Sequence, residues 1–126
     1  MKKKDFTVKK RLQSFRYAWN GIKLLVCREP NARIHCFAAI CVVLAGCFFH
    51  INREEWVAVM LAIGGVFAAE AINSSIETLA DLVSPEYNEA VKHTKDLAAG
   101  AVLLIAIAAA ITGCIIFIPY ISEYLH

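Results

Sequence analysis

The chain is organised around one stretch, Glu70-Ala71-Ile72-Asn73-Ser74-Ser75-Ile76-Glu77-Thr78-Leu79-Ala80-Asp81. Its polar positions follow at spacings of three, four and four, which at about 100° per residue place them on one side of a helix. They are Glu70, Asn73, Glu77 and Asp81. The preceding run, residues 56–69, contains no charged residue. A face with three carboxylates therefore directly follows a segment that has the composition of a membrane span.

The overall composition indicates an integral membrane protein. Hydrophobic residues make up 59% of the 126 positions and charged residues 19%, and the mean hydropathy is +0.55. A soluble domain of this size hides only part of its apolar surface, whereas lipid-facing surface needs no hiding. We expect a single all-α membrane domain over residues 1–126. We expect no cleavable signal peptide, because the first 33 residues are rich in Lys and Arg and lack a long apolar core.

Three charge-free stretches predict three transmembrane helices. The first, residues 34–51, just reaches the length needed to cross a bilayer. The second begins at an interfacial Trp and covers about residues 56–75, with an exposed extension to Ser84, where Pro85 discourages further helix. The third covers residues 97–121 and is the clearest of the three.

A basic, amphipathic helix is expected before the first span, at about residues 6–27. Its apolar side chains recur at intervals of three and four, with Lys and Arg between them: Val8, Leu12, Phe15, Trp19, Ile22 and Val26. Three arrangements stay open, namely a helix in the membrane interface, a helix packed on the bundle, and a coiled-coil strand. The Trp, Phe and Lys content favours the interface. A break or kink is expected at Arg28-Glu29-Pro30-Asn31, because Pro30 disfavours helical geometry at Glu29.

The distribution of basic residues predicts the orientation. Ten of the 13 Lys and Arg precede the first span, Arg53 alone lies in the first turn, and Lys92 and Lys95 lie in the linker between spans two and three. By the positive-inside rule, the N-terminus and that linker face the cytoplasm and the C-terminus lies outside. The polar face of the second span then points to the compartment that contains ATP.

The cysteines and histidines do not form a recognisable metal site. The five cysteines form no C-x-x-C pair and lack a histidine at zinc spacing, so we interpret them as small apolar residues. No two histidines share a helix face at i, i+4 spacing.

Carboxylates near the bilayer are costly unless they face water, a partner or a metal, so Glu70 and Glu77 point to a functional site. For Asp81, solvation or helix anchoring explains the residue equally well, and Asn73 could equally join two helices by a hydrogen bond. A small channel, a proton-coupled transporter or a structural subunit would also explain Glu70, although none of them explains the other carboxylates.

The residues near the predicted cytoplasmic interface suit a nucleotide and its metal. Glu29 and Glu77 would both lie there, and Mg²⁺ is often bound by one or two carboxylates together with nucleotide phosphates. Lys95 would add a positive charge at the same level, followed by Asp96. The chain contains no G-x-x-x-x-G-K-[ST] loop. Side chains and metal would therefore have to hold any nucleotide.

The order Glu29, then Glu70-x-x-Asn73-x-x-x-Glu77-x-x-x-Asp81, then Lys95-Asp96, resembles the small prokaryotic membrane lipid kinases of the diacylglycerol kinase and undecaprenol kinase family. The resemblance covers nearly the whole chain. The family signature is usually E-x-x-N-[TS]-A-I-E-x-x-x-D, and this chain has Ser75 where alanine is common. The resemblance implies a homotrimer of three-span subunits in the bacterial cytoplasmic membrane, with active sites shared between neighbours.

The resemblance also implies the substrates and the site residues. They are ATP, with Mg²⁺, and a membrane lipid alcohol, and no nucleic acid is expected as a partner. Glu70 would be the general base for the lipid hydroxyl, and Glu29 and Glu77 would hold metal. The residues that would contact ATP or its phosphates are Asn73, Glu77, Tyr87, Glu89, Lys95 and Asp96, with Asp81 in a supporting role. Asn88 replaces a residue that is often histidine in the family.

The lipid substrate is predicted from resemblance alone. Arg33-Ile34-His35, Ile63-Gly64-Gly65-Val66-Phe67 and Ile115-Ile116-Phe117-Ile118-Pro119 look more like the undecaprenol kinase branch than the diacylglycerol kinase branch, which tends to carry an acidic residue near position 35. Undecaprenol is therefore the first candidate and diacylglycerol the second.

Overall fold

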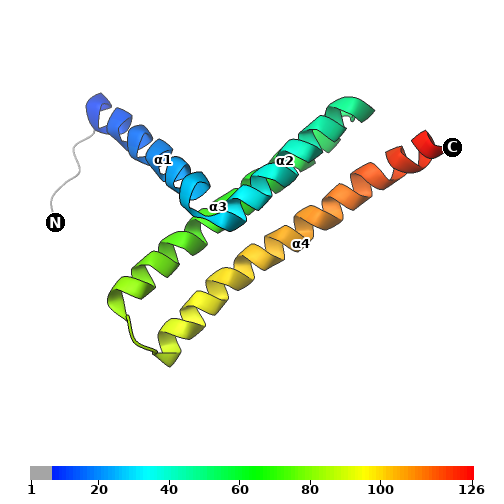
Figure 1. Ribbon diagram of the computed structural model, residues 1–126. Helices are drawn as coiled ribbons and strands as arrows, with labels where there is room; N and C mark the ends of the chain where they lie inside the picture. The colour runs from blue at the N-terminus through cyan, green and yellow to red at the C-terminus, as the bar shows by residue number, and fades with distance from the viewer. Residues whose placement is uncertain (1–6) are drawn as a thin grey trace.

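The computed structural model describes residues 7–126, and in this range the chain forms four helices and no strand. They are α1 (Val8–Arg28), α2 (Pro30–Phe49), α3 (Arg53–Val83) and α4 (Glu89–Leu125) (Figure 1). Helices α2, α3 and α4 are each long and apolar enough to cross a membrane. The expected all-α membrane class is confirmed. Residue 6, the first of the expected amphipathic helix, lies outside the described range.

The junction between α1 and α2 is a sharp break. Glu29 adopts an extended conformation, with φ −99° and ψ 114°, and Pro30 is the first residue of α2. Pro is well suited to the first helical position because its missing N–H would have no partner there. Arg33 fastens the junction, since its guanidinium donates hydrogen bonds to the carbonyl oxygens of Val26 and Cys27. Helix α2 therefore begins four residues before the first charge-free stretch.

Polar caps also determine where α3 and α4 begin. A capping box starts α3, in which the Glu55 N–H donates to Asn52 Oδ1 (2.9 Å) and the Asn52 N–H donates to Glu55 Oε1 (3.0 Å). This long helix then runs without interruption through the polar motif. Asn88 caps α4 by accepting a hydrogen bond from the Val91 N–H (3.2 Å). Helix α4 therefore begins within the expected linker.

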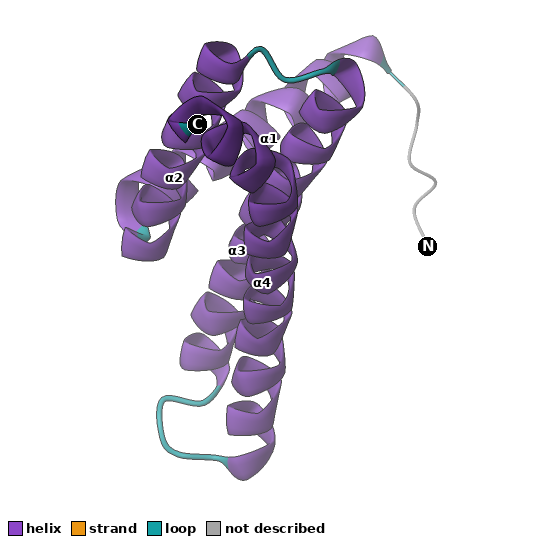
Figure 2. Ribbon diagram, turned by 90° about the vertical axis from the view of Figure 1, so that its right-hand side faces the viewer, coloured by secondary structure: helices purple, strands orange, loops and turns teal. Residues whose placement is uncertain are grey.

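Helices α3 and α4 form a long antiparallel hairpin, and α2 packs along the first part of α3 (Figures 1 and 2). Helix α1 leaves this bundle at an angle and contacts both α2 and α3. The buried apolar cluster, Ile51, Val59 and Ile116, lies at the end of the bundle where α2 ends and α3 begins. At the same end, the Tyr120 hydroxyl donates to Glu55 Oε1 at 2.5 Å. The polar motif lies at the opposite end of α3.

Gly46 allows α2 and α3 to approach closely. A Cβ atom at this position would lie 2.7 Å from Cη2 and 2.9 Å from Cζ2 of Trp56. The indole of Trp56 therefore packs directly on the backbone of α2. Next to it, His50 ends α2 in the left-handed conformation, with φ 52°.

Large apolar side chains cover the outside of the bundle. Phe37 on α2, Leu61 on α3 and Leu104 on α4 are all more than 70% exposed. The apolar residues of α1 are also exposed, including Phe15 (75%) and Trp19 (60%). Such a surface is suited to lipid or to another subunit, because water would leave it poorly solvated.

Candidate functional site

The polar motif occupies the second half of α3, where the helix rises directly from its apolar part. Glu70 is only 1% exposed and Asn73 only 8% exposed, and they are the only charged or polar residues among positions 7–126 that are buried. A carboxylate is removed from water only at considerable cost unless it has a partner. Glu70 is therefore the residue of the motif whose burial points most directly to a function.

Three side chains of the motif have a buried polar atom without a hydrogen-bond partner among the described residues. The atoms are Glu70 Oε2, Asn73 Oδ1 and Ser74 Oγ. Other hydroxyl groups on the helices donate a hydrogen bond to a carbonyl oxygen of their own helix. The Thr78 hydroxyl, for example, donates to the Ser74 carbonyl (2.9 Å). A buried polar group without a partner costs about 1–3 kcal/mol. These atoms together form a polar site with unused capacity to bind a ligand.

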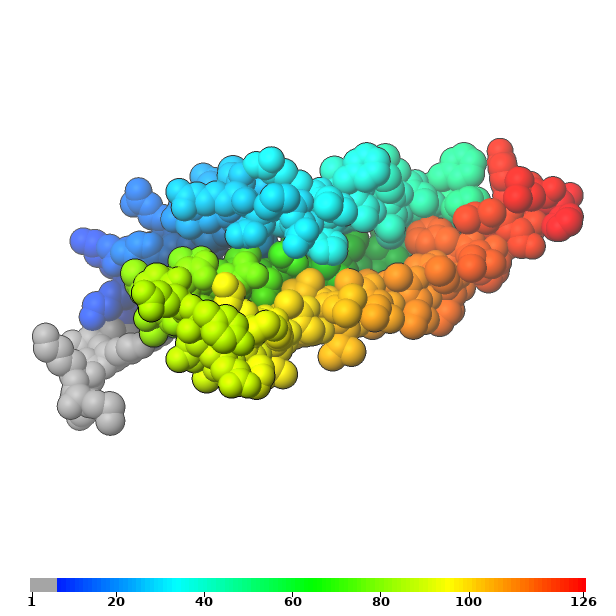
Figure 3. Space-filling view, turned by 60° about the horizontal axis from the view of Figure 1, so that its bottom comes forward, coloured from blue at the N-terminus to red at the C-terminus, as the bar shows by residue number. Residues whose placement is uncertain are grey.

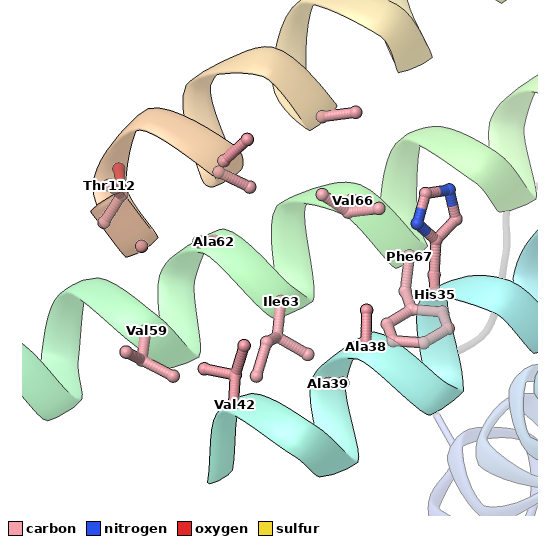
Figure 4. Close-up of a pocket in the computed structure, with 14 residues that line it drawn as sticks. His35, Ala38, Ala39, Val42, Val59, Ala62, Ile63, Val66, Phe67 and Thr112 are labelled. Atoms are coloured by element: carbon pink, nitrogen blue, oxygen red, sulfur yellow. The ribbon is translucent and has the colours of Figure 1, made fainter. Parts of the chain in front are cut away.

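An apolar pocket of about 240 Å³ lies between α2, α3 and α4 (Figure 4). It is lined mostly by small and aliphatic residues, with Val59 toward one end and His35 and Phe67 toward the other. In the space-filling view, α3 (green) is seen in the gap between α2 (cyan) and α4 (yellow to orange) (Figure 3). Glu70 follows Val66 and Phe67 by one turn of α3, so the pocket ends close to its carboxylate.

His35 is the one ionisable side chain among residues 7–126 that lies within ion-pair distance of Glu70. Its Nε2 lies 3.9 Å from Glu70 Oε2, which is within ion-pair range but too long for a hydrogen bond. The imidazole also meets the ring of Phe67 edge-on, with ring centroids 6.4 Å apart and an interplanar angle of 80°. The side chain of His35 is 26% exposed, against 2% for that of Glu70.

Asp81 and Lys95 join α3 to α4 at the end of the motif. Lys95 Nζ donates to Asp81 Oδ1 at 2.9 Å. This hydrogen bond, together with the charge of Asp81 and the weaker field of Glu77, raises the pKa of Lys95 above its usual value of 10.5. Lys95 is therefore charged at neutral pH, and it lies at the level of Glu77 and Asp81.

Asp96 and the loop residues do not join this cluster. Asp96 accepts a hydrogen bond from Lys92 Nζ (2.7 Å), and this bond lowers the pKa of Asp96 below its usual value of 3.8. Tyr87, in the loop between α3 and α4, is 79% exposed. Glu89 is the first residue of α4 and is also exposed. Within one subunit, these three predicted nucleotide contacts lie apart from the buried part of the site.

The family model of the prokaryotic diacylglycerol kinases matches residues 16–117, which include the whole motif on α3 and the start of α4. The chain belongs to the prokaryotic diacylglycerol kinase family. The expectation of a membrane lipid kinase is therefore confirmed at the level of the family, and the transporter alternative is set aside.

Relatives in this family carry two different names. A diacylglycerol kinase of Synechocystis is 40% identical over 113 residues, which are 88% of this chain and 65% of the relative. An undecaprenol kinase of Bacillus subtilis is 36% identical over 107 residues, or 85% and 87% of the two chains. A diacylglycerol kinase of Escherichia coli is 30% identical over 100 residues, or 79% and 82%. The chain thus spans slightly less than two thirds of the Synechocystis protein but most of the other two.

The residues expected to hold the metal of such a kinase fit the ion only in part. Glu29 and Glu77 are both half-buried. Among residues 7–126, no group of three or more His, Cys, Asp or Glu side chains is close enough to hold a metal ion. Mg²⁺ binds through one or two carboxylates when substrate phosphates supply further oxygens. Two carboxylates are therefore enough only for a magnesium ion whose other ligands are phosphate or water oxygens.

Two residues of the site were missed by sequence reasoning. The position of His35 next to Glu70 depends on how α2 packs on α3, and no local pattern in the sequence reveals it. Ser74 could have been found, because it follows Glu70 by four residues and so lies on the same side of the helix.

Proposed function

We propose that this chain transfers the γ-phosphoryl group of ATP to the hydroxyl of a membrane lipid alcohol, converting undecaprenol to undecaprenyl phosphate. The observation that carries the proposal is the buried carboxylate of Glu70 at the end of an apolar pocket, with Oε2 unpaired. A lipid alcohol has the matching character, because its chain is apolar and only its hydroxyl needs a polar partner. Family membership supports the same class of reaction.

In this proposal Glu70 is the general base. It accepts the proton of the lipid hydroxyl while the hydroxyl oxygen attacks the γ-phosphorus, and the bond from that phosphorus to the bridging oxygen of ADP breaks. Phosphoryl transfer needs mainly positioning and charge stabilisation from the protein, together with a base for the hydroxyl proton. The surroundings of Glu70 exclude water, so the lipid hydroxyl does not have to compete with water for the phosphoryl group.

The residues toward the end of α3 would position the nucleotide. Asn73 and Lys95 would contact its phosphates, with Asp81 holding Lys95 in place through the hydrogen bond already described. Glu29 and Glu77 would hold Mg²⁺, which when bound neutralises phosphate charge. Each turn of α3 advances about 5.4 Å. The proposed site therefore runs along about three turns, from the lipid at Glu70 to the nucleotide end at Asp81.

We also propose a homotrimer in the cytoplasmic membrane, with its N-terminus in the cytoplasm and its C-terminus outside. The positive-inside rule supports this orientation, and the exposed apolar side chains on all three spans leave room for subunit contacts. Tyr87, Glu89 and Asp96 lie apart from Glu70 within one subunit, which fits a site completed by a neighbour. In that arrangement they would contact the nucleotide held by the adjacent subunit.

The size of the pocket supports undecaprenol as the substrate, and diacylglycerol is the alternative. A cavity of about 150 Å³ can hold benzene, so a pocket of about 240 Å³ holds roughly one or two isoprene-sized groups next to the hydroxyl. The remainder of a long chain would lie in the lipid. Diacylglycerol is the second candidate, because relatives at 40% and 30% identity are named diacylglycerol kinases.

A phosphotransfer assay tests both the function and the substrate. The purified protein in detergent receives ATP and Mg²⁺ with either undecaprenol or diacylglycerol, and the lipid phosphate is quantified. We expect product with undecaprenol at a kcat/KM at least tenfold above that with diacylglycerol. The reverse ratio would assign the chain to diacylglycerol, and no product with either lipid would reject the proposed activity.

The variant Glu70→Gln tests the base in the same assay. The amide is close in size to the carboxylate but cannot accept the proton, so we expect loss of at least 10³-fold in kcat with oligomeric state unchanged. Glu54→Gln is the matched control on the same helix, because Glu54 is exposed in the first turn of α3. Turnover by Glu70→Gln at the wild-type rate would remove Glu70 from the role of base.

A further inference from the structure

The burial of Glu70 creates a problem that the proposed function does not solve. After each transfer the carboxyl group holds a proton, and it must lose that proton before it can act again. With a side chain only 2% exposed, it has almost no contact with solvent. On the basis of the function proposed above, we propose that His35 carries this proton from Glu70 to solvent. His35 is then a relay residue that acts through the base.

The geometry of His35 suits this role. Its Nε2 lies 3.9 Å from Glu70 Oε2, the oxygen without a hydrogen-bond partner. A small rotation of either side chain brings the two atoms within hydrogen-bond distance. The imidazole is held by its edge-on contact with Phe67 and is 26% exposed, so one side faces the carboxyl group while another part reaches outward. Figure 4 shows the His35 and Phe67 rings together at one end of the pocket.

The proton balance of the relay is simple. Neutral His35 with its proton on Nδ1 offers the lone pair of Nε2 to the protonated Glu70 carboxyl group. The proton moves from the carboxyl oxygen to Nε2, which leaves a carboxylate and an imidazolium. The imidazolium ring then turns outward and gives its Nε2 proton to water, which leaves the neutral ring with its proton on Nδ1, as at the start. Histidine suits both steps because each of its two ring nitrogens can accept or donate a proton.

No other described residue offers the same route. Among residues 7–126, His35 is the only basic side chain with an ion-pair contact to Glu70. Asn73 and Ser74 lie one turn away on the same helix, but an amide and a hydroxyl do not gain or lose a proton near neutral pH. Apart from His35 itself, the pocket is lined by apolar residues and Thr112, whose hydroxyl already donates to the Ala108 carbonyl at 2.8 Å.

The test compares the first turnover with the steady state in two variants of nearly equal shape. His35→Gln cannot carry a proton, whereas His35→Glu can. With undecaprenol, ATP and Mg²⁺ mixed rapidly, we expect His35→Gln to keep the single-turnover rate within about threefold of the wild type. Its steady-state kcat should fall at least tenfold, so that product appears as a burst of about one per site. His35→Glu should return the steady-state rate to within about threefold of its own single-turnover rate.

A role in holding the substrate or in folding would give a different result. In that case His35→Gln would slow the first turnover as much as the steady state, and no burst above the wild-type level would appear, which overturns the relay. Equal behaviour of the Gln and Glu variants would overturn it as well. His50→Gln, at the opposite end of α2, is the control and should match the wild type in both rates. A wild-type enzyme without lipid kinase activity would instead reject the underlying function.

Discussion

Lys95 on α4 and Asp81 on α3 are joined by a hydrogen bond of 2.9 Å across the loop between the two longest helices. The bond connects the last turns of one helix to the second turn of the other. It thereby holds the cation of Lys95 at a place where the charge of Glu77 also acts on it. Asp81, to which the sequence assigned only a supporting role, thus has a defined contact with Lys95.

Replacing Asp81 by Asn should affect the nucleotide more than the fold. The pair is exposed and therefore contributes little stability, so we expect the melting temperature in detergent to change by less than about 3 °C. Without the carboxylate Lys95 is no longer held, and KM for ATP should rise about three- to tenfold with kcat nearly unchanged. Lys95→Met, which removes the cation itself, should lower kcat as well. An unchanged KM for ATP in Asp81→Asn would show that the pair does not position Lys95.

The same pair predicts a pH effect whose sign follows from the pKa of Lys95. The pKa of Lys95 is raised in the folded state. The stabilisation of the folded state by the pair is therefore fully present below the unfolded pKa of 10.5. It is lost as the pH rises through the folded value. Titration of Lys95 by NMR should therefore show an upward shift that disappears in Asp81→Asn.

Ser74 and Ser75 should differ in their effect on activity although they are neighbours. Ser74 Oγ is buried without a described partner, whereas Ser75 Oγ donates to the Ile72 carbonyl at 2.8 Å and belongs to an exposed residue. Ser74 follows Glu70 by four residues, or about 6 Å along the axis, and so lies between the base and Glu77. A hydroxyl at that level can donate to the transferred phosphoryl group.

We therefore expect Ser74→Ala to lower kcat about tenfold or more, because hydrogen bonds to charged groups contribute about 1.5–3 kcal/mol. Ser75→Ala should retain kcat within twofold. Ser74→Thr, which keeps the hydroxyl, should restore most of the activity. Equal activity of the two alanine variants would place the Ser74 hydroxyl outside the reaction.

Gly46 should be sensitive to a single methyl group while Gly64 is not. A Cβ at position 46 would lie 2.7 Å from the indole of Trp56. A Cβ at position 64 would have no atom of another described helix within 4 Å. Overpacking of this kind costs about 1–3 kcal/mol. Thermal unfolding in detergent should show a clear decrease for Gly46→Ala and none for Gly64→Ala. A stable Gly46→Ala variant would mean that Trp56 can move aside without loss.

Removal of magnesium should stop the proposed reaction, and Glu77 should determine how much of the ion is needed. Only two carboxylates, those of Glu29 and Glu77, are proposed to bind the ion. Each of them should therefore contribute substantially to the affinity for Mg²⁺. Glu77→Gln should raise the half-saturating Mg²⁺ concentration about tenfold in the phosphotransfer assay. Glu86→Gln, in the loop after α3, is a control of equal charge change. A Glu77→Gln enzyme with the wild-type magnesium requirement would exclude Glu77 as a metal ligand.

The sequence predicted the spans well because an apolar run of about 20 residues without charge is characteristic of a helix that crosses a bilayer. It placed the helix starts less well. Helix α3 begins at Arg53 and α4 at Glu89, outside the charge-free stretches, because Asn52 and Asn88 cap them in polar surroundings. A search for runs without charge excludes the polar residues that begin a helix.

The site was predicted where it depends on one helix and missed where it depends on two. Spacing along α3 was enough to put Glu70 and Asn73 on a common side. The contacts between His35 and Glu70, and between Lys95 and Asp81, join residues on different helices. Such contacts follow from the packing of whole helices, which a single sequence does not encode in any short pattern.

The two ends of the bundle are built differently, and this has a practical consequence for purification. The aromatic and aliphatic cluster, with the Tyr120 to Glu55 hydrogen bond, lies at the end away from the motif. Around Glu70 there are instead buried polar atoms without a hydrogen-bond partner among the described residues. Harsh extraction from the membrane would therefore loosen the reactive end first, and a preparation could keep its full helical circular dichroism after its activity is gone.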